Sequence, residues 1–191
     1  MVKAILLAAG ESKRLEDKNK LLKIFKKKFL VNHSLNNLIK SNVDKIIIVI
    51  GHQRKELKSK ILKNKKNIFV INKKYKTGIS SSIKIGLKKI SKKDKGFIIV
   101  HSDMPFIKTS YINKICASIN QRKYLVHVLK FKNQIGNPVG FDFSILNKFK
   151  KISGDIGAKY MVKRLKNRTK YIHVKSKKIF KDLDRISDFR G

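Results

Sequence analysis

Short apolar runs alternate along this chain with segments of helical character. Apolar runs of strand length lie within the segments 4–9, 46–50, 68–71, 96–105 and 124–131. Between them, the segments 29–39, 53–62 and 109–119 read as helices. Continuous apolar runs are typical of buried strands, and apolar residues recurring every three to four positions are typical of amphipathic helices. The pattern therefore predicts strands and helices in alternation.

This alternation predicts the fold class. Near-continuous apolar strands separated by helices favour a mostly parallel sheet with helices on both faces and right-handed crossovers. We therefore expect an α/β protein with three α/β/α layers, formed by a single domain over residues 1–191. Ligands of such sheets bind at the carboxyl ends of the strands, so chemistry is expected in the loops that follow them.

Composition narrows the class of protein. At 191 residues and 41% hydrophobic content the chain can bury a sizeable core, and no segment approaches the roughly 20 apolar residues of a membrane span. The N-terminus lacks the pattern of a signal peptide, so a soluble cytoplasmic protein without a membrane partner is expected. Cys116 is the only cysteine, which excludes an internal disulfide and predicts a small core residue.

The net charge of +36 raises the alternative of a non-catalytic, basic nucleic-acid-binding protein. Lysine dominates the basic residues, which are spread from Lys3 to Lys181 and resemble a compositional bias of the whole chain. No zinc-ligand spacing, aromatic RNA-binding strand or Gly-x-x-Gly loop accompanies them. We therefore expect no nucleic-acid partner, although the charge would attract a small anionic substrate.

The first apolar run ends in a basic loop that contains a glycine. Gly10 has no Cβ, so its backbone can approach a phosphate closely, and Arg14 and Lys20 supply positive charge. Neither Gly-x-x-x-x-Gly-Lys-Ser/Thr nor Gly-x-Gly-x-x-Gly is present. The loop is predicted to hold a triphosphate, and the alternative is an ordinary β–α loop with surface lysines.

Two further segments carry candidate chemistry. Asp103 follows an apolar run and should project into the same crevice as the first loop, where a carboxylate is a natural Mg²⁺ ligand. Because Pro105 follows, Asp103 can also begin a turn. After Gly78, the serines at 80–82 stand at a predicted helix start, where they can cap the helix or contact a ligand.

These segments resemble those of a known family. The first loop carries Leu-Ala-Ala-Gly-x-Ser-x-Arg at 7–14 and Asn-Lys-Leu-Leu at 19–22. This order resembles the signature of the MobA-like NTP transferases, and within them most closely the molybdenum cofactor cytidylyltransferases. Similar segments follow in the family's order at 72–87, 102–105, 136–139 and 154–159, and the chain ends with an Asp-x-Asp at 182–184. The resemblance covers nearly the whole chain.

The resemblance implies a nucleotide-diphospho-sugar transferase type of Rossmann-like fold and assigns roles to particular residues. The implied catalytic residues are Arg14, Lys20 and Asp103, with Asp103 also the ligand of Mg²⁺. The implied nucleotide-binding residues are Leu7, Ala8, Ala9, Gly10, Ser12, Gly78, Ser80, Ser81 and Ser82. The implied acceptor-binding residues are Asn137, Pro138 and Asp155, and Asp155 can instead cap the next helix.

The chain also departs from the family pattern. Glu16 stands where Gly is usual, Ser102 replaces a Gly or Ala, and Lys159 replaces an Arg. Near the C-terminus, a Thr-Pro pair has become Arg185-Ile186. These changes weaken the expectations for phosphate affinity and for the path of the tail.

The expected reaction is the transfer of CMP from CTP to molybdopterin with release of pyrophosphate. The partners implied by the resemblance are CTP or another NTP, a phosphorylated acceptor, and a molybdoenzyme or its chaperone. The alternative enzyme is an NTP transferase that acts on a sugar phosphate or a polyol phosphate. No spacing among the five histidines indicates a nucleophile or a metal site, so no covalent intermediate is expected.

Overall fold

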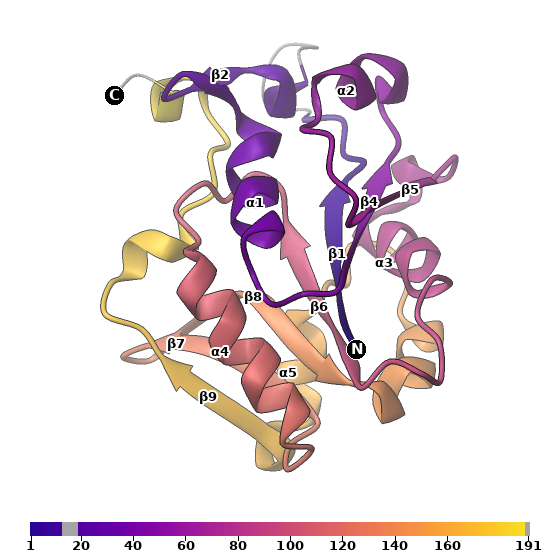
Figure 1. Ribbon diagram of the computed structural model, residues 1–191, viewed down its shortest axis with the longest axis vertical. Coiled ribbons are helices and arrows are strands. Elements are labelled where there is room, and N and C mark those ends of the chain that lie inside the picture. Colours follow the sequence, from indigo (N-terminus) through magenta and orange to yellow (C-terminus); the bar gives the residue numbers. More distant parts are fainter. Residues whose placement is uncertain (13–18, 190–191) are drawn as a thin grey trace.

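A seven-stranded sheet forms the centre of the protein (Figure 1). The computed structural model describes residues 1–12 and 19–189. The strands, in the order in which they pair, are β5 (Asn67–Ile71), β4 (Lys45–Ile50), β1 (Val2–Ala8), β6 (Gly96–His101), β8 (Gln134–Asp142), β7 (Val126–Phe131) and β9 (Thr169–His173). Among the described strands of this sheet, only β8 runs antiparallel to its neighbours. The expected, mostly parallel sheet is confirmed.

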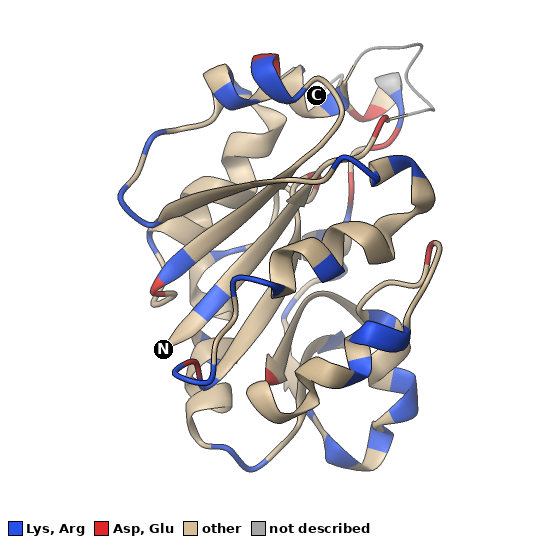
Figure 2. Cartoon of the chain, turned by 90° about the vertical axis from the view of Figure 1, so that its right-hand side faces the viewer, with Lys and Arg blue, Asp and Glu red and all other residues tan. Residues whose placement is uncertain are grey.

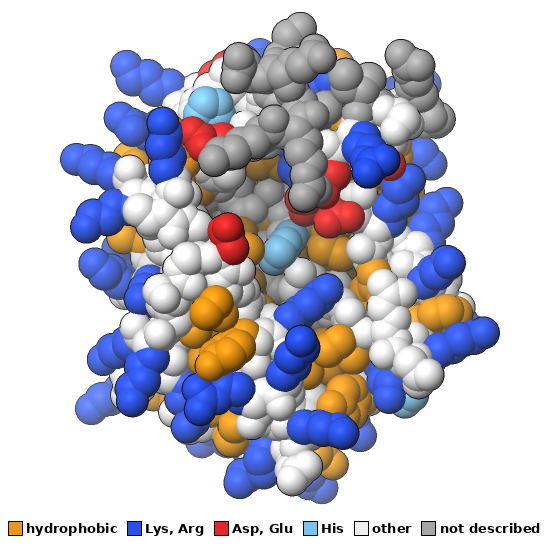
Figure 3. Space-filling model, turned by 180° about the vertical axis from the view of Figure 1, so that it is seen from behind, with side chains coloured by type: hydrophobic (Ala, Val, Ile, Leu, Met, Phe, Trp, Pro, Cys, Tyr) orange, Lys and Arg blue, Asp and Glu red, His pale blue; other side chains and the backbone are white. Residues whose placement is uncertain are grey.

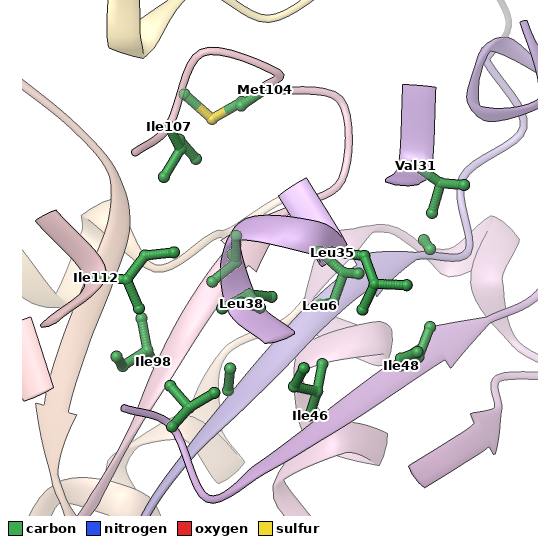
Figure 4. Close-up of a cluster of buried hydrophobic side chains, with 14 of the residues drawn as sticks. Leu6, Val31, Leu35, Leu38, Ile46, Ile48, Ile98, Met104, Ile107 and Ile112 are labelled. Atoms are coloured by element: carbon green, nitrogen blue, oxygen red, sulfur yellow. The ribbon is translucent and has the colours of Figure 1, made fainter. Parts of the chain in front are cut away.

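Helices cover both faces of this sheet. One face carries α1 (Leu30–Ile39), α2 (Arg54–Lys60) and α4 (Thr109–Asn120), and the other carries α3 (Ile79–Leu87), the 3-10 helix η3 (Phe143–Lys151) and α5 (Lys159–Arg164). Figure 4 shows part of the first interface, where Leu35 and Leu38 of α1 pack over strand residues such as Leu6. The three-layer α/β/α arrangement is confirmed.

Short elements complete the described chain. They are a hairpin of β2 (Ile24–Phe25) and β3 (Lys28–Phe29) and the 3-10 helices η1 (Lys20–Leu22), η2 (Tyr75–Thr77), η4 (Lys166–Arg168), η5 (Lys177–Phe180) and η6 (Ile186–Phe189). No described helix has both the length and the apolar character needed to cross a membrane. In Figure 2 the basic residues are spread over helices and loops, while the central strands are largely uncharged.

The order of the strands decides where a ligand can bind. The chain proceeds from β1 outward to β4 and β5, and then returns to place β6 on the other side of β1. The strand order therefore reverses between β1 and β6, and the loops that leave these two strands diverge there. Such a switch point opens a crevice at the carboxyl ends of the strands. The Gly10 loop and the Asp103 loop both begin at this crevice.

The sequence pattern did not predict β8 and β9. β8 contains Gly136, Pro138 and Gly140, which are residues that weaken a central strand. The register between β7 and β8 shifts between Val128 and Leu129. Val128 pairs with Val139, but the next residue, Leu129, pairs with Gly136. Asn137 and Pro138 thus occupy a bulge, where the ladder does not need the missing N–H of proline.

Cys116 and His127 are buried ionisable residues that lie away from the crevice. Cys116 on α4 is 2% exposed, which confirms it as a core residue, and burial raises the pKa of its thiol to about 12. His127 on β7 is fully buried, and its Nδ1 lies 2.8 Å from the hydroxyl of Ser118. Burial lowers the pKa of His127 to about 4, although the backbone of Tyr124 and the charge of Asp142 oppose this effect.

The buried imidazole predicts that stability falls in mild acid. Between about pH 6.5 and pH 4 the unfolded chain binds a proton at His127 and the folded chain does not, so the free energy of unfolding decreases as the pH falls through this window. The expected loss between pH 7 and pH 5 is about 2 kcal/mol. Urea denaturation of His127→Gln at both pH values should show a loss smaller by this amount. The same loss as in the unmutated protein would contradict the assignment, and His173→Gln at an exposed site is the control.

Candidate active site

The loop after β1 is held by its own polar groups. Ser12 has a positive φ of 57°, and its hydroxyl oxygen accepts a hydrogen bond of 3.1 Å from the backbone N–H of Lys20. The side chain of Asn19 caps η1 by accepting a hydrogen bond from the N–H of Leu21. These bonds place Lys20 at the mouth of the crevice. Arg14 lies outside the described residues, so its catalytic role stays a prediction.

The loop after β6 is anchored to β1 and to the end of the chain. The hydroxyl of Ser102 donates a hydrogen bond of 2.6 Å to the carbonyl oxygen of Leu7, so the serine fits where the family has Gly or Ala. The N–H of Leu183 donates to the carbonyl oxygen of Asp103 at 3.0 Å. The C-terminal segment therefore runs beside the Asp103 loop, which brings the Asp-x-Asp pair to the crevice.

Lys20 joins these two segments. Its Nζ lies 2.6 Å from Oδ2 of Asp103 and 2.5 Å from Oδ1 of Asp184. The Lys20 side chain is 14% exposed. Burial disfavours its charge, but the two carboxylates outweigh burial and raise the pKa of Lys20 above its usual value. The ammonium is therefore charged at every physiological pH. Sequence reasoning found Lys20 and Asp103 but assigned no role to Asp184.

The pair of carboxylates provides ligands of the kind that a divalent cation requires. Oδ1 of Asp103 is buried and has no hydrogen-bond partner among the described residues. No group of three or more His, Cys, Asp and Glu side chains in the described chain is arranged to hold a metal ion. Mg²⁺ binds oxygen atoms and commonly takes only one or two protein carboxylates, with phosphates and water as further ligands. Asp103 and Asp184 therefore fit such a cation, provided that Lys20 withdraws.

A cleft of about 400 Å³ opens above this ion pair. Seven of the predicted nucleotide-binding residues line it, namely Leu7, Ala8, Ala9, Gly10, Ser12, Gly78 and Ser82. Lys20 and Asp103 line it too, together with residues that sequence reasoning did not assign, among them Tyr75, Lys76 and His101. On the face shown in Figure 3, acidic side chains gather near a histidine in a surface otherwise rich in lysine.

The other two serines do not line the cleft. The hydroxyl of Ser81 donates to the carbonyl oxygens of Lys74 and Gly78, at 3.0 and 2.8 Å, and accepts a hydrogen bond of 2.8 Å from Asn72. Ser80 is buried, and its N–H donates to the carbonyl oxygen of Gly154. These serines fasten the turn that leads into α3. Nucleotide contact by Ser80 or Ser81 therefore has no support from the geometry of the cleft and stays a prediction.

The start of α3 is built from a segment far along the chain. Gly78 has a φ of 100°, and a Cβ at this position would collide with the backbone of Gly154. Oδ1 of Asp155 accepts a hydrogen bond of 3.3 Å from the N–H of Ile79, the first residue of α3. Asp155 thus caps α3. The suggestion that it caps the next helix is wrong, because α5 follows Ala158 and has no side-chain cap.

A second cavity of about 350 Å³ adjoins this cleft. It is lined by groups suited to a polar ligand, including Gln134, Asn137, Asp155, Lys159, Phe180 and Asp182. Oδ1 of Asn137 is buried and has no hydrogen-bond partner among the described residues. Asn137 and Asp155 therefore lie together at this cavity, and acceptor contact by them stays a prediction. Pro138 is not among the lining residues, and acceptor contact by it stays a prediction.

His101, the last residue of β6, lies between the two cavities. Burial lowers the pKa of its imidazole, and Asp103 opposes this effect. Its side chain is half-buried. The only signal for His101 in the sequence is its place two residues before Asp103.

Solved structures share this fold. Rv0371c from Mycobacterium tuberculosis superimposes with a TM-score of 0.86 at 18% identity, covering 99% of this chain and 95% of that chain. Its complex with manganese superimposes with a TM-score of 0.80 at 16% identity, covering 99% and 96%. The 4-diphosphocytidyl-2C-methyl-D-erythritol synthase of Anaerococcus prevotii gives 0.77 at 15% identity, covering 99% and 92%. At these identities the similarity establishes the fold alone.

Sequence comparison identifies the class of the protein as a nucleotidyltransferase domain. The bifunctional protein GlmU of Clostridioides difficile is 28% identical over 149 residues, which cover 76% of this chain and 31% of that protein. The chain thus spans about a third of the length of the curated relatives it matches. It belongs to the family of the MobA-like NTP transferase domain, whose model matches residues 4–169. The resemblance noted in the sequence is therefore confirmed at the level of the family.

The ion pair predicts competition between Lys20 and a metal ion. Asp103 and Asp184 cannot hold the ammonium and a divalent cation at once, so Lys20→Met should bind Mn²⁺ more tightly in the absence of nucleotide. We expect about tenfold tighter binding, or about 1.4 kcal/mol. Asp103→Asn should bind Mn²⁺ more weakly than the unmutated protein. Electron paramagnetic resonance of free Mn²⁺ measures both effects.

The control for this measurement is Lys76→Met, which also removes one positive charge from the cleft. Lys76 lies 3.6 Å from Glu11 at the cleft mouth and does not contact Asp103 or Asp184 in the described structure. An equal gain in both lysine variants would show a general charge effect and would contradict direct competition.

Proposed function

We propose that this chain transfers CMP from CTP to the phosphate of molybdopterin and releases pyrophosphate. The observation that carries the proposal is the pair of joined cavities, because a cleft beside Lys20 and Asp103 meets a second polar cavity at His101 and Asp155. Two substrates can be held in them with their phosphates at the junction. A protein that only binds nucleic acid would not need this arrangement.

In the proposed reaction an oxygen atom of the acceptor phosphate attacks the α-phosphorus of CTP. The bond from this phosphorus to the bridging oxygen of the β-phosphate breaks, and pyrophosphate leaves with that bond's electron pair. No group on the protein becomes covalently attached. Catalysis then consists of positioning the two phosphates and neutralising their charge.

The loop after β1 supplies most of the contacts in this scheme. Gly10 lies in the cleft lining, and the space around its α-carbon is open, so a phosphate can approach its backbone. Lys20 can exchange its carboxylate partners for the phosphates without losing its charge. A divalent cation on Asp103 and Asp184, which we expect to be Mg²⁺, would supply further neutralisation of the phosphate charge.

The residues that line the second cavity can bind the acceptor molecule. Lys159 provides a positive charge, and Asp155, Asp182 and the unpaired carbonyl oxygen of Asn137 can accept hydrogen bonds. The amino and ring N–H groups of a pterin are donors of the matching kind. The ring of Phe180 in the lining offers a surface for a flat heterocycle. The resemblance of the segment 136–139 to the molybdenum cofactor cytidylyltransferases supports the same acceptor.

A sugar phosphate or polyol phosphate is the second candidate acceptor. The hydrogen-bond acceptors of the second cavity can bind hydroxyl groups as well as N–H groups. These hydrogen-bond acceptors are Asn137, Asp155 and Asp182. The erythritol-cytidylyl synthase described above shares the fold, and its name describes a cytidylyl product of a polyol. Incubation of the protein with CTP and each acceptor, followed by a pyrophosphate assay, separates the two candidates. Failure of both would leave the acceptor proposal without support.

Base choice is expected to depend on Ala9, since the resemblance places Ala in cytidylyltransferases where the related guanylyltransferases have Gly. Ala9 lies in the cleft lining but is only 3% exposed, and its methyl group lies against Gly51, which Tyr75 also approaches closely. The methyl group would therefore act chiefly through the packing around Gly51, which borders the Tyr75 wall of the cleft. A wall placed for a pyrimidine leaves less room for a purine.

The metal-binding role of Asp103 predicts a large loss of turnover in Asp103→Asn. The amide is nearly isosteric but cannot neutralise a cation, so pyrophosphate release should fall by about 100-fold or more, or at least ~2.7 kcal/mol in the barrier. Circular dichroism should show an unchanged fold. Glu56→Gln on the exposed face of α2 is the charge-matched control. Near-normal turnover in Asp103→Asn would remove this residue from the reaction.

The cleft wall predicts a preference for CTP over GTP. Exclusion of the larger base should contribute about 1–3 kcal/mol, which corresponds to roughly 5- to 150-fold in affinity. Competition binding of the two nucleotides measures this ratio, and Ala9→Gly should reduce it. Equal affinities, or tighter GTP binding, in the unmutated protein would disprove the cytidylyl assignment while leaving the fold and the metal site intact.

A further inference from the structure

The two cavities meet at three residues, and this junction is where the proposed chemistry must occur. Ile79, His101 and Asp155 line both the nucleotide cleft and the acceptor cavity. A phosphate of a ligand in one cavity can reach the phosphorus of a ligand in the other only past these side chains. A side chain that contacts the reacting phosphate from both cavities, in addition to Gly10 and Lys20 in the nucleotide cleft, should therefore be among them.

Two of the three side chains are unsuited to bind a phosphate. Ile79 is apolar. Asp155 carries a negative charge, and its Oδ1 already accepts the hydrogen bond from the N–H of Ile79 that caps α3. A carboxylate has no proton to donate to a phosphate oxygen at neutral pH, whereas an imidazole has at least one N–H in either of its protonation states. By elimination, His101 is the junction side chain that can donate.

The position of His101 is well defined. It pairs with Leu7 in the β1–β6 ladder, and the next residue, Ser102, is bonded to the carbonyl oxygen of the same Leu7. Asp103 follows in the turn after β6, and the side chains of His101 and Asp103 both line the cleft. The imidazole ring of His101 therefore lies in the same cleft as the Asp103 carboxylate, which forms the ion pair with Lys20.

The hydrogen-bonding state of His101 differs from that of the structural histidines. Nε2 of His33 lies 2.7 Å from the carbonyl oxygen of Phe25, and Nδ1 of His127 lies 2.8 Å from the hydroxyl of Ser118. Within residues 1–12 and 19–189, no hydrogen bond engages the ring of His101. A half-buried imidazole with an available donor, facing two cavities, is arranged for a ligand.

We propose that His101 is a catalytic residue that donates a hydrogen bond to the reacting phosphate at the junction and holds the acceptor phosphate in line with the α-phosphorus of the nucleotide. This inference rests on the nucleotidyl transfer proposed above. The residue forms no covalent bond in the reaction. Its contribution is the positioning of a nucleophile and the stabilisation, by a hydrogen bond, of the negative charge on the phosphate oxygen as the new bond forms.

The kinetic test compares His101→Ala with His101→Gln, using CTP and molybdopterin as substrates. His101→Ala should lower kcat for pyrophosphate release by about 10- to 100-fold and change the KM for CTP by less than about twofold. His101→Gln keeps an N–H donor and should recover at least part of the lost kcat. His173→Ala, at an exposed site, is the control. Thermal denaturation of each variant reports whether the fold is intact.

The binding test does not depend on turnover. In long-range ¹H–¹⁵N spectra of the histidine rings, with a non-hydrolysable CTP analogue and Mg²⁺ present, added inorganic phosphate should shift the His101 signals saturably. The His101→Gln spectrum assigns those signals, and the exposed His173 should shift little and without saturation. Inorganic phosphate stands in for the phosphate of the acceptor.

The outcomes separate the two proposals. A normal kcat in a folded His101→Ala protein, or His101 signals that move no more than those of His173, would overturn the role of His101 and leave nucleotidyl transfer standing. Saturable His101 shifts without pyrophosphate release from CTP and molybdopterin would support the phosphate contact and reject the proposed acceptor. Equal losses of kcat in His101→Ala and His101→Gln would also overturn the donor role.

Discussion

The contact between the Lys20 ammonium and the carboxylates of Asp103 and Asp184 is the interaction on which the site depends. It joins the loop after β1, the loop after β6 and the C-terminal segment, which are far apart in the sequence. Without the lysine the two carboxylates would repel each other, and without the carboxylates the half-buried ammonium would be poorly solvated. The same contact keeps the ammonium and the carboxylate oxygens together at the cleft. A nucleotide offers Lys20 new anionic partners, so ligand binding and release of the carboxylates are physically coupled.

The net positive charge of the chain makes the position of these carboxylates informative, because acidic residues are rare in it. The protein has 48 Lys and Arg residues but only 12 Asp and Glu residues. Five of the 12 lie at the two cavities or on Lys20, namely Glu11, Asp103, Asp155, Asp182 and Asp184. In a chain so poor in acid, this concentration makes the two cavities the region best suited to bind a cation and hydrogen-bond donors. The excess lysine, by contrast, is spread over helices and loops (Figure 2) and supplies a general attraction for anions.

The turn into α3 links the two substrate cavities. Gly78 packs against the backbone of Gly154 at a distance that no Cβ would allow, and Asp155 caps α3 through the N–H of Ile79. The segment that carries Asp155 and Lys159 is therefore docked onto the wall of the nucleotide cleft. Movement of this segment would change both cavities together, because Asp155 lines both. Gly78 and Asp155 stabilise the turn into α3 whether or not they also contact a substrate.

Much of the fold could be predicted from the sequence because its signals are local. The buried strands β1, β4 and β6 are continuous apolar runs, α1 and α4 have apolar faces, and the loops with Lys20 and Asp103 follow strand ends that a parallel sheet brings to one edge. The family likewise could be recognised from the order of these loops.

Tertiary structure decided the remainder. β8 could not be predicted because Pro138 is compatible with a central strand only where a bulge removes the need for its N–H. Three features of the site join residues that are separated by tens of positions or by whole elements. They are the contact of Asp184 with Lys20, the capping of α3 by Asp155 and the position of His101 at the junction of the two cavities. No local periodicity encodes such contacts, because they depend on how the loops pack once the sheet has formed.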